Sequence, residues 1–147
     1  MHEEIVAVTP EVEDDENEAI EVVTPATYYL KNGKHYIVYE EVVEGTSGVI
    51  KNRIKINGEE CVEIVKSGLS NSHMIFEKNK KNQTFYKTPY GQMLIGVNTR
   101  HLQVDFEEDK IAVQIDYELD VNHEPMADCK IRMNIVSKDS GKFSVLS

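Results

Sequence analysis

The sequence IAVQIDYEL, residues Ile111 to Leu119, alternates apolar and polar side chains. After the polar segment Asn122–Pro125, the alternation returns in ADCKIRMNI, residues Ala127 to Ile135. Successive side chains of a β-strand point to opposite faces of the sheet, so each stretch has one apolar and one polar face. Two such stretches joined by a short loop predict an antiparallel hairpin with one face on a core and the other in water.

The same period of two recurs upstream, and no stretch shows the 3.6-residue apolar period of a helix. Asn32–Gly33 is a strong hairpin signal, because a type I′ turn needs positive φ at both central residues. We count eight to ten strands joined mostly by short turns. The fold class we expect is all-β, a single antiparallel up-and-down β-barrel whose interior is either filled or holds one small ligand.

Some details of the barrel stay open at this point. Pro25 has no backbone N–H and marks an edge, a bulge or a strand start in the expected strand Ile20–Leu30. The strand Lys34–Val43 is apolar on both faces, so its orientation is undecided and we expect cover on both sides. Gly96 predicts a bulge or a close approach of two backbones. A corner is expected at Thr88–Gly91.

Charge is concentrated at the amino-terminal end of the chain. The 147 residues carry a formal net charge of −10, and nine of the 26 acidic residues lie in residues 1–30, which contain no Lys or Arg. We therefore expect an acidic segment over residues 1–18, with a short edge strand at Ile5–Val8 and a loop at Thr9–Asn17. The barrel domain is expected over residues 19–138, and a loose tail over residues 139–147.

Composition also excludes several classes of protein. A nucleic-acid binder needs a surplus of Lys and Arg over acidic residues, which this chain lacks. No apolar run approaches the roughly 20 residues of a membrane span, and we find no secretory signal. The two cysteines, Cys61 and Cys129, lie far apart, so we expect a cytoplasmic protein with reduced thiols. The five histidines form no ligand-spaced pair, and we expect neither a metal nor a cofactor.

One charged pair is expected inside the barrel. Glu41 shares a strand face with Tyr39, and Lys66 shares a face with Val62 and Ile64. A buried carboxylate needs a partner, so an internal Glu41–Lys66 ion pair at a barrel end is expected in preference to a catalytic carboxylate. The chain has seven Tyr and no Trp, and inward hydroxyls would give a partly polar interior, although filling of the core is the alternative. The residues we expect to reach a ligand in the interior are Tyr39, Glu41, Lys66, Tyr86, Thr99 and Tyr117.

Several short motifs, in this order and spacing, resemble the YwiB-like family of small uncharacterised bacterial proteins. The segments that carry the resemblance are Tyr28–Tyr29, Lys31–Lys34, Tyr36–Ile37, Tyr39–Glu41, Ile54–Ile56, Thr88–Gly91, Thr99, Tyr117 and Leu119. The resemblance implies a lipocalin-like (calycin-type) β-barrel and a cytoplasmic bacterial setting, but no activity. The chain departs from the family at Asn52–Arg53, where a Thr is usual, and at Lys66, where an Arg is usual.

Three functions from different classes follow from this reading. The first is a non-enzymatic module that binds a small, partly apolar ligand in the barrel. The alternative is a protein-interaction module, a homodimer with a filled barrel, which would use the exposed face of Lys34–Val43. An enzyme has the least support, because the sequence contains no nucleophile elbow, phosphate loop or paired cysteine motif.

Overall fold

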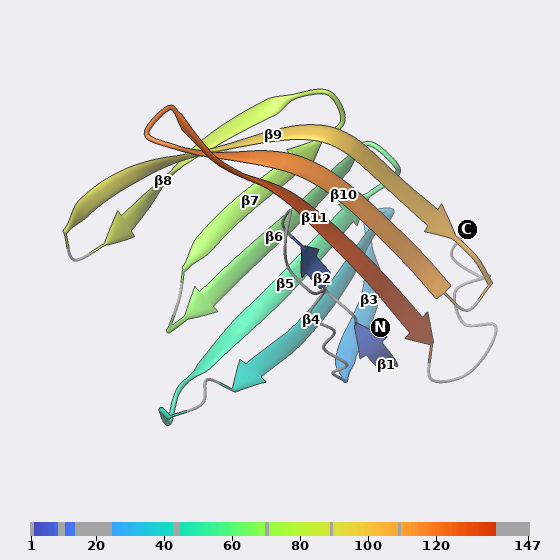
Figure 1. The fold of residues 1–147 in the computed structure, drawn as a ribbon. Helices are drawn as coiled ribbons and strands as arrows, with labels where there is room; N and C mark the ends of the chain where they lie inside the picture. Colours follow the sequence, from blue (N-terminus) through green and yellow to red (C-terminus); the bar gives the residue numbers. More distant parts are fainter. Residues whose placement is uncertain are drawn as a thin grey trace.

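A computed structural model describes residues 2–8, 11–13, 25–42, 45–69, 71–88, 90–108 and 110–137. These residues form eleven strands and no helix, and Figure 1 shows the strands curving around one interior. The strands are β1 (His2–Val8), β2 (Glu11–Glu13), β3 (Ala26–Lys31), β4 (Lys34–Val42), β5 (Val49–Asn57), β6 (Cys61–Gly68), β7 (Ser72–Glu77), β8 (Lys81–Thr88), β9 (Gly91–Phe106), β10 (Lys110–Val121) and β11 (Glu124–Ser137).

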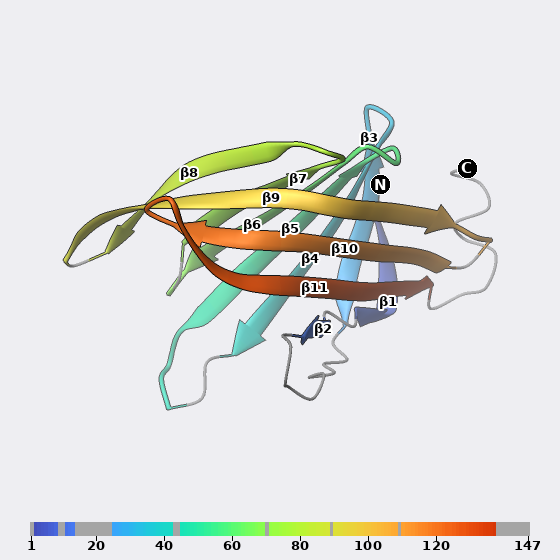
Figure 2. The ribbon, with the colours of Figure 1, turned by 45° about the horizontal axis from the view of Figure 1, so that its top comes forward.

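All of the strands belong to one antiparallel sheet. Their order is β7-β6-β5-β4-β3-β1-β11-β10-β9-β8, and β2 pairs with β11 beside this path. The prediction of an all-β antiparallel fold is therefore confirmed. The hydrogen-bonded ladder does not close into a complete ring, because β7 and β8 lie at the two ends of the order, as Figure 2 shows.

The amino-terminal strands differ from the expectation. β1 is not an edge strand, because it pairs with β3 on one side and with β11 on the other. β2 lies within the stretch Thr9–Asn17 that was expected to be a loop, and with β1 it brings the count above the eight to ten strands expected. Glu11 and Glu13 stand opposite Arg132 and Lys130 in the register, a pairing that apolar alternation alone does not reveal.

Some expectations fall outside the described residues. These are Ile20–Thr24 of one expected strand, Val43 of another, Pro89 in the expected corner and the tail after Ser137. The division of the chain at residues 18 and 138 stays a prediction.

Local backbone geometry follows the turn chemistry of the sequence. Asn32 and Gly33 have φ values of 53° and 76°, so the type I′ turn is confirmed. β3 begins directly after Pro25, which makes this proline a strand start. The expectation for Gly96 is wrong, because the register passes through it without a bulge on either side and two side chains approach it instead of a second backbone. A Cβ there would lie 3.1 Å from Lys81 Cε and 3.3 Å from Asp120 Cβ.

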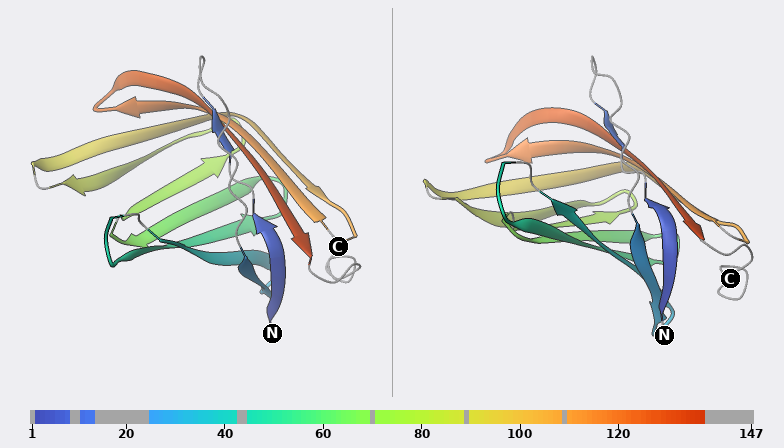
Figure 3. Two further views of the ribbon diagram at one scale, coloured as in Figure 1. Left: turned by 60° about the horizontal axis from the view of Figure 1, so that its bottom comes forward. Right: turned by 90° about the horizontal axis from the view of Figure 1, so that it is seen from below.

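The register settles the orientation of β4. His35, Ile37 and Tyr39 are buried in the interior, whereas Tyr36 and Val38 lie half-buried on the outer face, where Tyr36 stacks on Tyr29. Cross-strand rows continue this inner face through β5, β6 and β7, and Figure 3 shows the opposite wall formed by β9, β10 and β11. Fully buried side chains of this size each contribute about 1.5–3 kcal/mol. The largest of them are Tyr28, Phe76, Ile37, Ile54, Ile56, Leu102, Ile111, Ile115, Met133 and Ile135.

Candidate functional site

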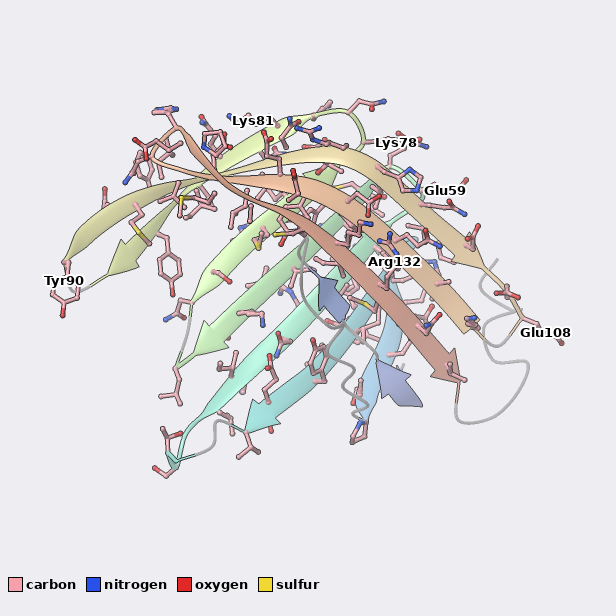
Figure 4. All side chains as sticks on the ribbon, in the orientation of Figure 1. Glu59, Lys78, Lys81, Tyr90, Glu108 and Arg132 are labelled. Carbon is pink, nitrogen blue, oxygen red and sulfur yellow. The ribbon has the colours of Figure 1, made fainter. Side chains whose placement is uncertain are left out.

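The two edge strands, β7 and β8, share a turn and then diverge. At the turn, the amide of Lys80 donates to the carbonyl of Glu77 at 3.0 Å, and Asn82 Nδ2 donates to the carbonyl of Ile75 at 3.3 Å. Beyond Asn82 no β7–β8 ladder exists among the described residues. In Figure 4 the labelled Lys78 marks this end of the barrel, which we call the turn end, and Tyr90 marks the tip of the β8–β9 hairpin at the opposite, cavity end.

A cavity of about 820 Å³ lies where β7 and β8 have separated. Its volume falls within the range of roughly 300–1,000 Å³ that is typical of small-molecule sites. Most of the wall is apolar or aromatic, and a few hydroxyl, amide and amine groups interrupt it. The lining residues are Val65, Lys66, Ser67, Asn71, Ser72, His73, Met74, Thr84, Phe85, Tyr86, Met93, Ile95, Tyr117 and Leu119.

Tyr117 lies at the boundary between the cavity and the packed core. Its ring meets Phe76 edge-on, with centroids 4.9 Å apart, and only 7% of the residue is exposed. Burial, and secondarily the neighbouring Cys129, raises the pKa of the Tyr117 hydroxyl. The hydroxyl is protonated at neutral pH, as tyrosine hydroxyls ordinarily are, and gives the cavity wall a neutral hydrogen-bonding group.

The Glu41–Lys66 ion pair expected from the sequence is present, but it is partly exposed instead of buried, so the expectation of an internal pair is wrong. Lys66 Nζ lies 3.2 Å from Glu41 Oε1, and the two side chains are 38% and 42% exposed. Asn52 Nδ2 donates to the same carboxylate oxygen at 2.7 Å, and Asn52 itself is fully buried. In the register Asn52 stands between Tyr39 and Lys66, so these three side chains lie in one row across the inner face of β4, β5 and β6. Burial, and secondarily the Glu41 carboxylate, raises the pKa of Tyr39 to about 12.

The buried side-chain oxygens that lack a hydrogen-bond partner among the described residues include two that lie inside the barrel. These two are Oδ1 of Asn52 and Oγ1 of Thr99, and both residues are at most 1% exposed. Burying a polar group without a partner costs about 1–3 kcal/mol, so nearly all buried groups in folded proteins are satisfied. Both atoms lie at interior positions, and Thr99 stands opposite Tyr117 in the register.

The structure divides the six expected site residues into two groups. Lys66, Tyr86 and Tyr117 line the cavity, whereas Tyr39, Glu41 and Thr99 do not. Glu41 remains linked to the first group through its ion pair with Lys66. Whether any of the six contacts a ligand stays a prediction.

Several lining residues were not singled out from the sequence. Met74, Thr84, Met93, Ile95 and Leu119 all occupy the inner face of regular strands, so nothing in their pattern separates them from ordinary core positions. Asn52 did carry a signal, because it interrupts the apolar face formed by Ile50, Ile54 and Ile56.

The described part of the chain has neither a metal-binding cluster nor a membrane-spanning helix. No group of three or more His, Cys, Asp or Glu side chains there is placed to hold a metal ion. That part of the chain also contains no helix with the length and apolar character needed to cross a membrane.

Comparisons with known proteins agree with this fold. A family model described as "Domain of unknown function (DUF1934)" matches residues 5–133. The uncharacterized beta-barrel protein YwiB of Bacillus subtilis (strain 168) is 32% identical over 114 residues, which cover 77% of this chain and 78% of that protein. The crystal structure of the ywiB protein from Bacillus subtilis matches with a TM-score of 0.76 and 25% sequence identity over 94% of each chain. The resemblance to the YwiB-like proteins is thus confirmed, and the chain belongs to the DUF1934 family of β-barrel proteins of unknown function.

Proposed function

We propose that this protein is a non-enzymatic module that binds a small, partly apolar ligand in the cavity between β7 and β8. The single observation that carries the proposal is the 820 Å³ cavity itself, with its apolar wall and a few inward polar groups. Such a combination is typical of sites where apolar contact supplies affinity and a few hydrogen bonds supply orientation.

The position of the cavity supports a role in binding. It lies where consecutive strands separate without a ladder, so a ligand can reach the interior without breaking backbone hydrogen bonds between β7 and β8. Met74 and Met93 border the space, and unbranched thioether side chains adapt readily to different ligand shapes.

The alternative function is homodimerisation through the outer face of β4. Val42 is 81% exposed at the end of this strand, and Tyr36 and Val38 are half-buried beside it. This alternative assumes a barrel whose interior is filled, and a cavity of about 820 Å³ argues against that assumption. Sedimentation at high protein concentration tests it, and a monomer would count against it.

A cytoplasmic location is also part of the proposal, as is a lipocalin-like architecture. Cys61 and Cys129 form no disulfide, which supports the cytoplasmic setting, because disulfides are rare in reducing compartments.

Binding can be tested with a neutral fluorescent probe, N-phenylnaphthylamine, whose emission rises in apolar surroundings. The chain contains no Trp, so intrinsic background is low. Thr84 lines the cavity, and Thr84→Trp places an indole ring in it, which should weaken probe binding by about tenfold. The adjacent Gln83 is exposed and does not line the cavity, so Gln83→Trp is the matched control and should leave binding unchanged. Equal binding by both variants, or no binding by the natural protein, would contradict the proposal.

A further inference from the structure

The cavity carries almost no net charge of its own. Lys66 is the only Lys, Arg, Asp or Glu among the described residues that line it. The Lys66 ammonium is paired with the Glu41 carboxylate at 3.2 Å, so the two charges offset one another. His73 is the other lining residue able to carry a charge, and its Nε2 lies 2.8 Å from Glu63 Oε1.

The Glu41 carboxylate is fixed in place beside Lys66. Asn52 Nδ2 donates to the same oxygen, Oε1, that Lys66 approaches, and Asn52 is fully buried. A charged ligand that came close to Lys66 would therefore also come close to Glu41. An anion would be repelled by the carboxylate, and a cation by the ammonium.

The same pair leaves hydrogen-bonding capacity for a neutral group. An ammonium has three N–H donors, and Lys66 uses one of them on Glu41. The second carboxylate oxygen, Glu41 Oε2, makes no hydrogen bond to another described residue. The pair can thus donate to and accept from one ligand group at the same time.

We propose that the cavity takes an uncharged amphiphile, an apolar chain or ring that ends in a neutral group able both to donate and to accept, such as a hydroxyl or a primary amide. The inference rests on the proposed function, because it names the class of ligand for the same cavity. The apolar part lies against Met74, Met93 and Ile95, and the neutral end reaches Lys66, beside which the Glu41 carboxylate lies just outside the cavity lining. Tyr117 fits this class, because its hydroxyl on the cavity wall is a neutral group that can donate and accept.

The natural protein is tested first, with four ligands that share one chain length. Decanol, decanamide, decanoic acid and decylamine are titrated at neutral pH, below their aggregation limits, against bound N-phenylnaphthylamine. The alcohol and the amide are expected to displace the probe at concentrations about tenfold lower than the acid and the amine.

Two variants then separate the two charges. Lys66→Met leaves the carboxylate alone and should move the preference toward decylamine by about tenfold. Glu41→Gln keeps the shape of the side chain, leaves the ammonium alone, and should move the preference toward decanoic acid by a similar factor. Lys80→Met is the control, because Lys80 forms a Lys–Glu ion pair of similar length with Glu77, at 3.3 Å, and neither residue lines the cavity.

The outcomes distinguish the two proposals. In one outcome the probe binds, and decanoic acid or decylamine displaces it at lower concentration than both decanol and decanamide. That result overturns the charge inference and leaves the binding function standing. Binding with the same order of preference in Lys66→Met and Glu41→Gln as in the natural protein also overturns the charge inference. Failure of the probe and of all four ligands to bind overturns the proposed function and the charge inference together.

Discussion

The two ends of the barrel use their inward side chains differently. At the turn end, a row across β4 to β7 consists of His35, Ile56, Val62 and Phe76, none of which is more than 6% exposed. At the cavity end, the row that contains Asn52 and Lys66 is polar and partly open. The sheet therefore has one end that is packed as a core and one end that has space for another molecule.

The separation of β7 from β8 causes the difference. Near the turn Lys78–Lys80 these strands are close enough for Asn82 to reach the carbonyl of Ile75. Further along, each strand keeps only its other neighbour, β6 for β7 and β9 for β8. Polar side chains and empty volume accumulate where the wall is open, because no facing strand supplies apolar contacts there.

The largest effect is expected from Phe76, a packed residue on the turn-end side. Phe76→Ala should lower the free energy of unfolding by about 3–5 kcal/mol, since the residue is fully buried and leaves a void. Met74, the next inward residue along β7, borders the cavity, so Met74→Ala should cost only about 1 kcal/mol. Urea denaturation measures both values. Similar losses for the two variants would contradict the contrast between the ends.

A backbone effect of intermediate size is expected at Gly68. This glycine has φ +110°, and a Cβ there would lie 2.5 Å from the carbonyl oxygen of Val49. Gly68→Ala should therefore cost about 1–3 kcal/mol. Gly58, at the turn end, also has positive φ but has nothing within 4 Å of the added Cβ. Gly58→Ala should cost less, about 1 kcal/mol, and thermal unfolding of the pair compares them.

The turn end should also respond to mild acid. The ring of His35 is buried, Nδ1 lies 2.6 Å from the Tyr28 hydroxyl, and burial lowers the pKa of His35. Because the unfolded chain binds the proton first, stability should be complete above about pH 6.5 and should fall as the pH drops from there toward the lower folded pKa. His35→Gln should reduce this slope in stability measured against pH. An unchanged slope in the variant would show that His35 is not its cause.

A separate acid effect belongs to the outer face. The hydrogen bond from His73 is the main cause that lowers the pKa of Glu63. The ionised Glu63 carboxylate therefore stabilises the fold above the ordinary carboxyl pKa, and this stabilisation is lost as the pH falls toward the lower folded pKa. The loss occurs at a more acid pH than the loss caused by His35. The two pH windows therefore distinguish the residues.

The smallest effect on stability is expected at the cavity end. Lys66 and Glu41 are each more than a third exposed, and such ion pairs contribute about 0–1 kcal/mol. Lys66→Met should therefore change the free energy of unfolding by less than about 1 kcal/mol while it changes ligand preference. A loss as large as that of Phe76→Ala would show that the pair is part of the core.

The sequence predicted much of the fold because period-two alternation and turn residues are local properties. Asn32–Gly33 formed the expected turn. The strand faces on which Glu41 and Lys66 lie were enough to predict that the two side chains pair. Residues that depend on distant neighbours were harder to predict. Local pattern could not show that β1 pairs with β11, or that two side chains crowd Gly96.

The cavity could be predicted only in part for the same reason. Lys66, Tyr86 and Tyr117 were identified as polar or aromatic exceptions on inward faces. Met93 and Ile95 look like any core residues in the sequence, and only the divergence of β7 from β8 makes them a wall.

The strand order in the sheet is a rotation of the strand order in the chain. β7 and β8 follow one another in sequence yet stand at the two edges, whereas β1 and β11 are far apart in sequence and pair directly. A cut at Asn79 would therefore break a covalent link without breaking a ladder. The two fragments would carry β1 to β7 and β8 to β11. Except for β2, which pairs with β11, each is an unbroken run of neighbouring strands, and they would reassemble by complementation through the contact of β1 and β2 with β11.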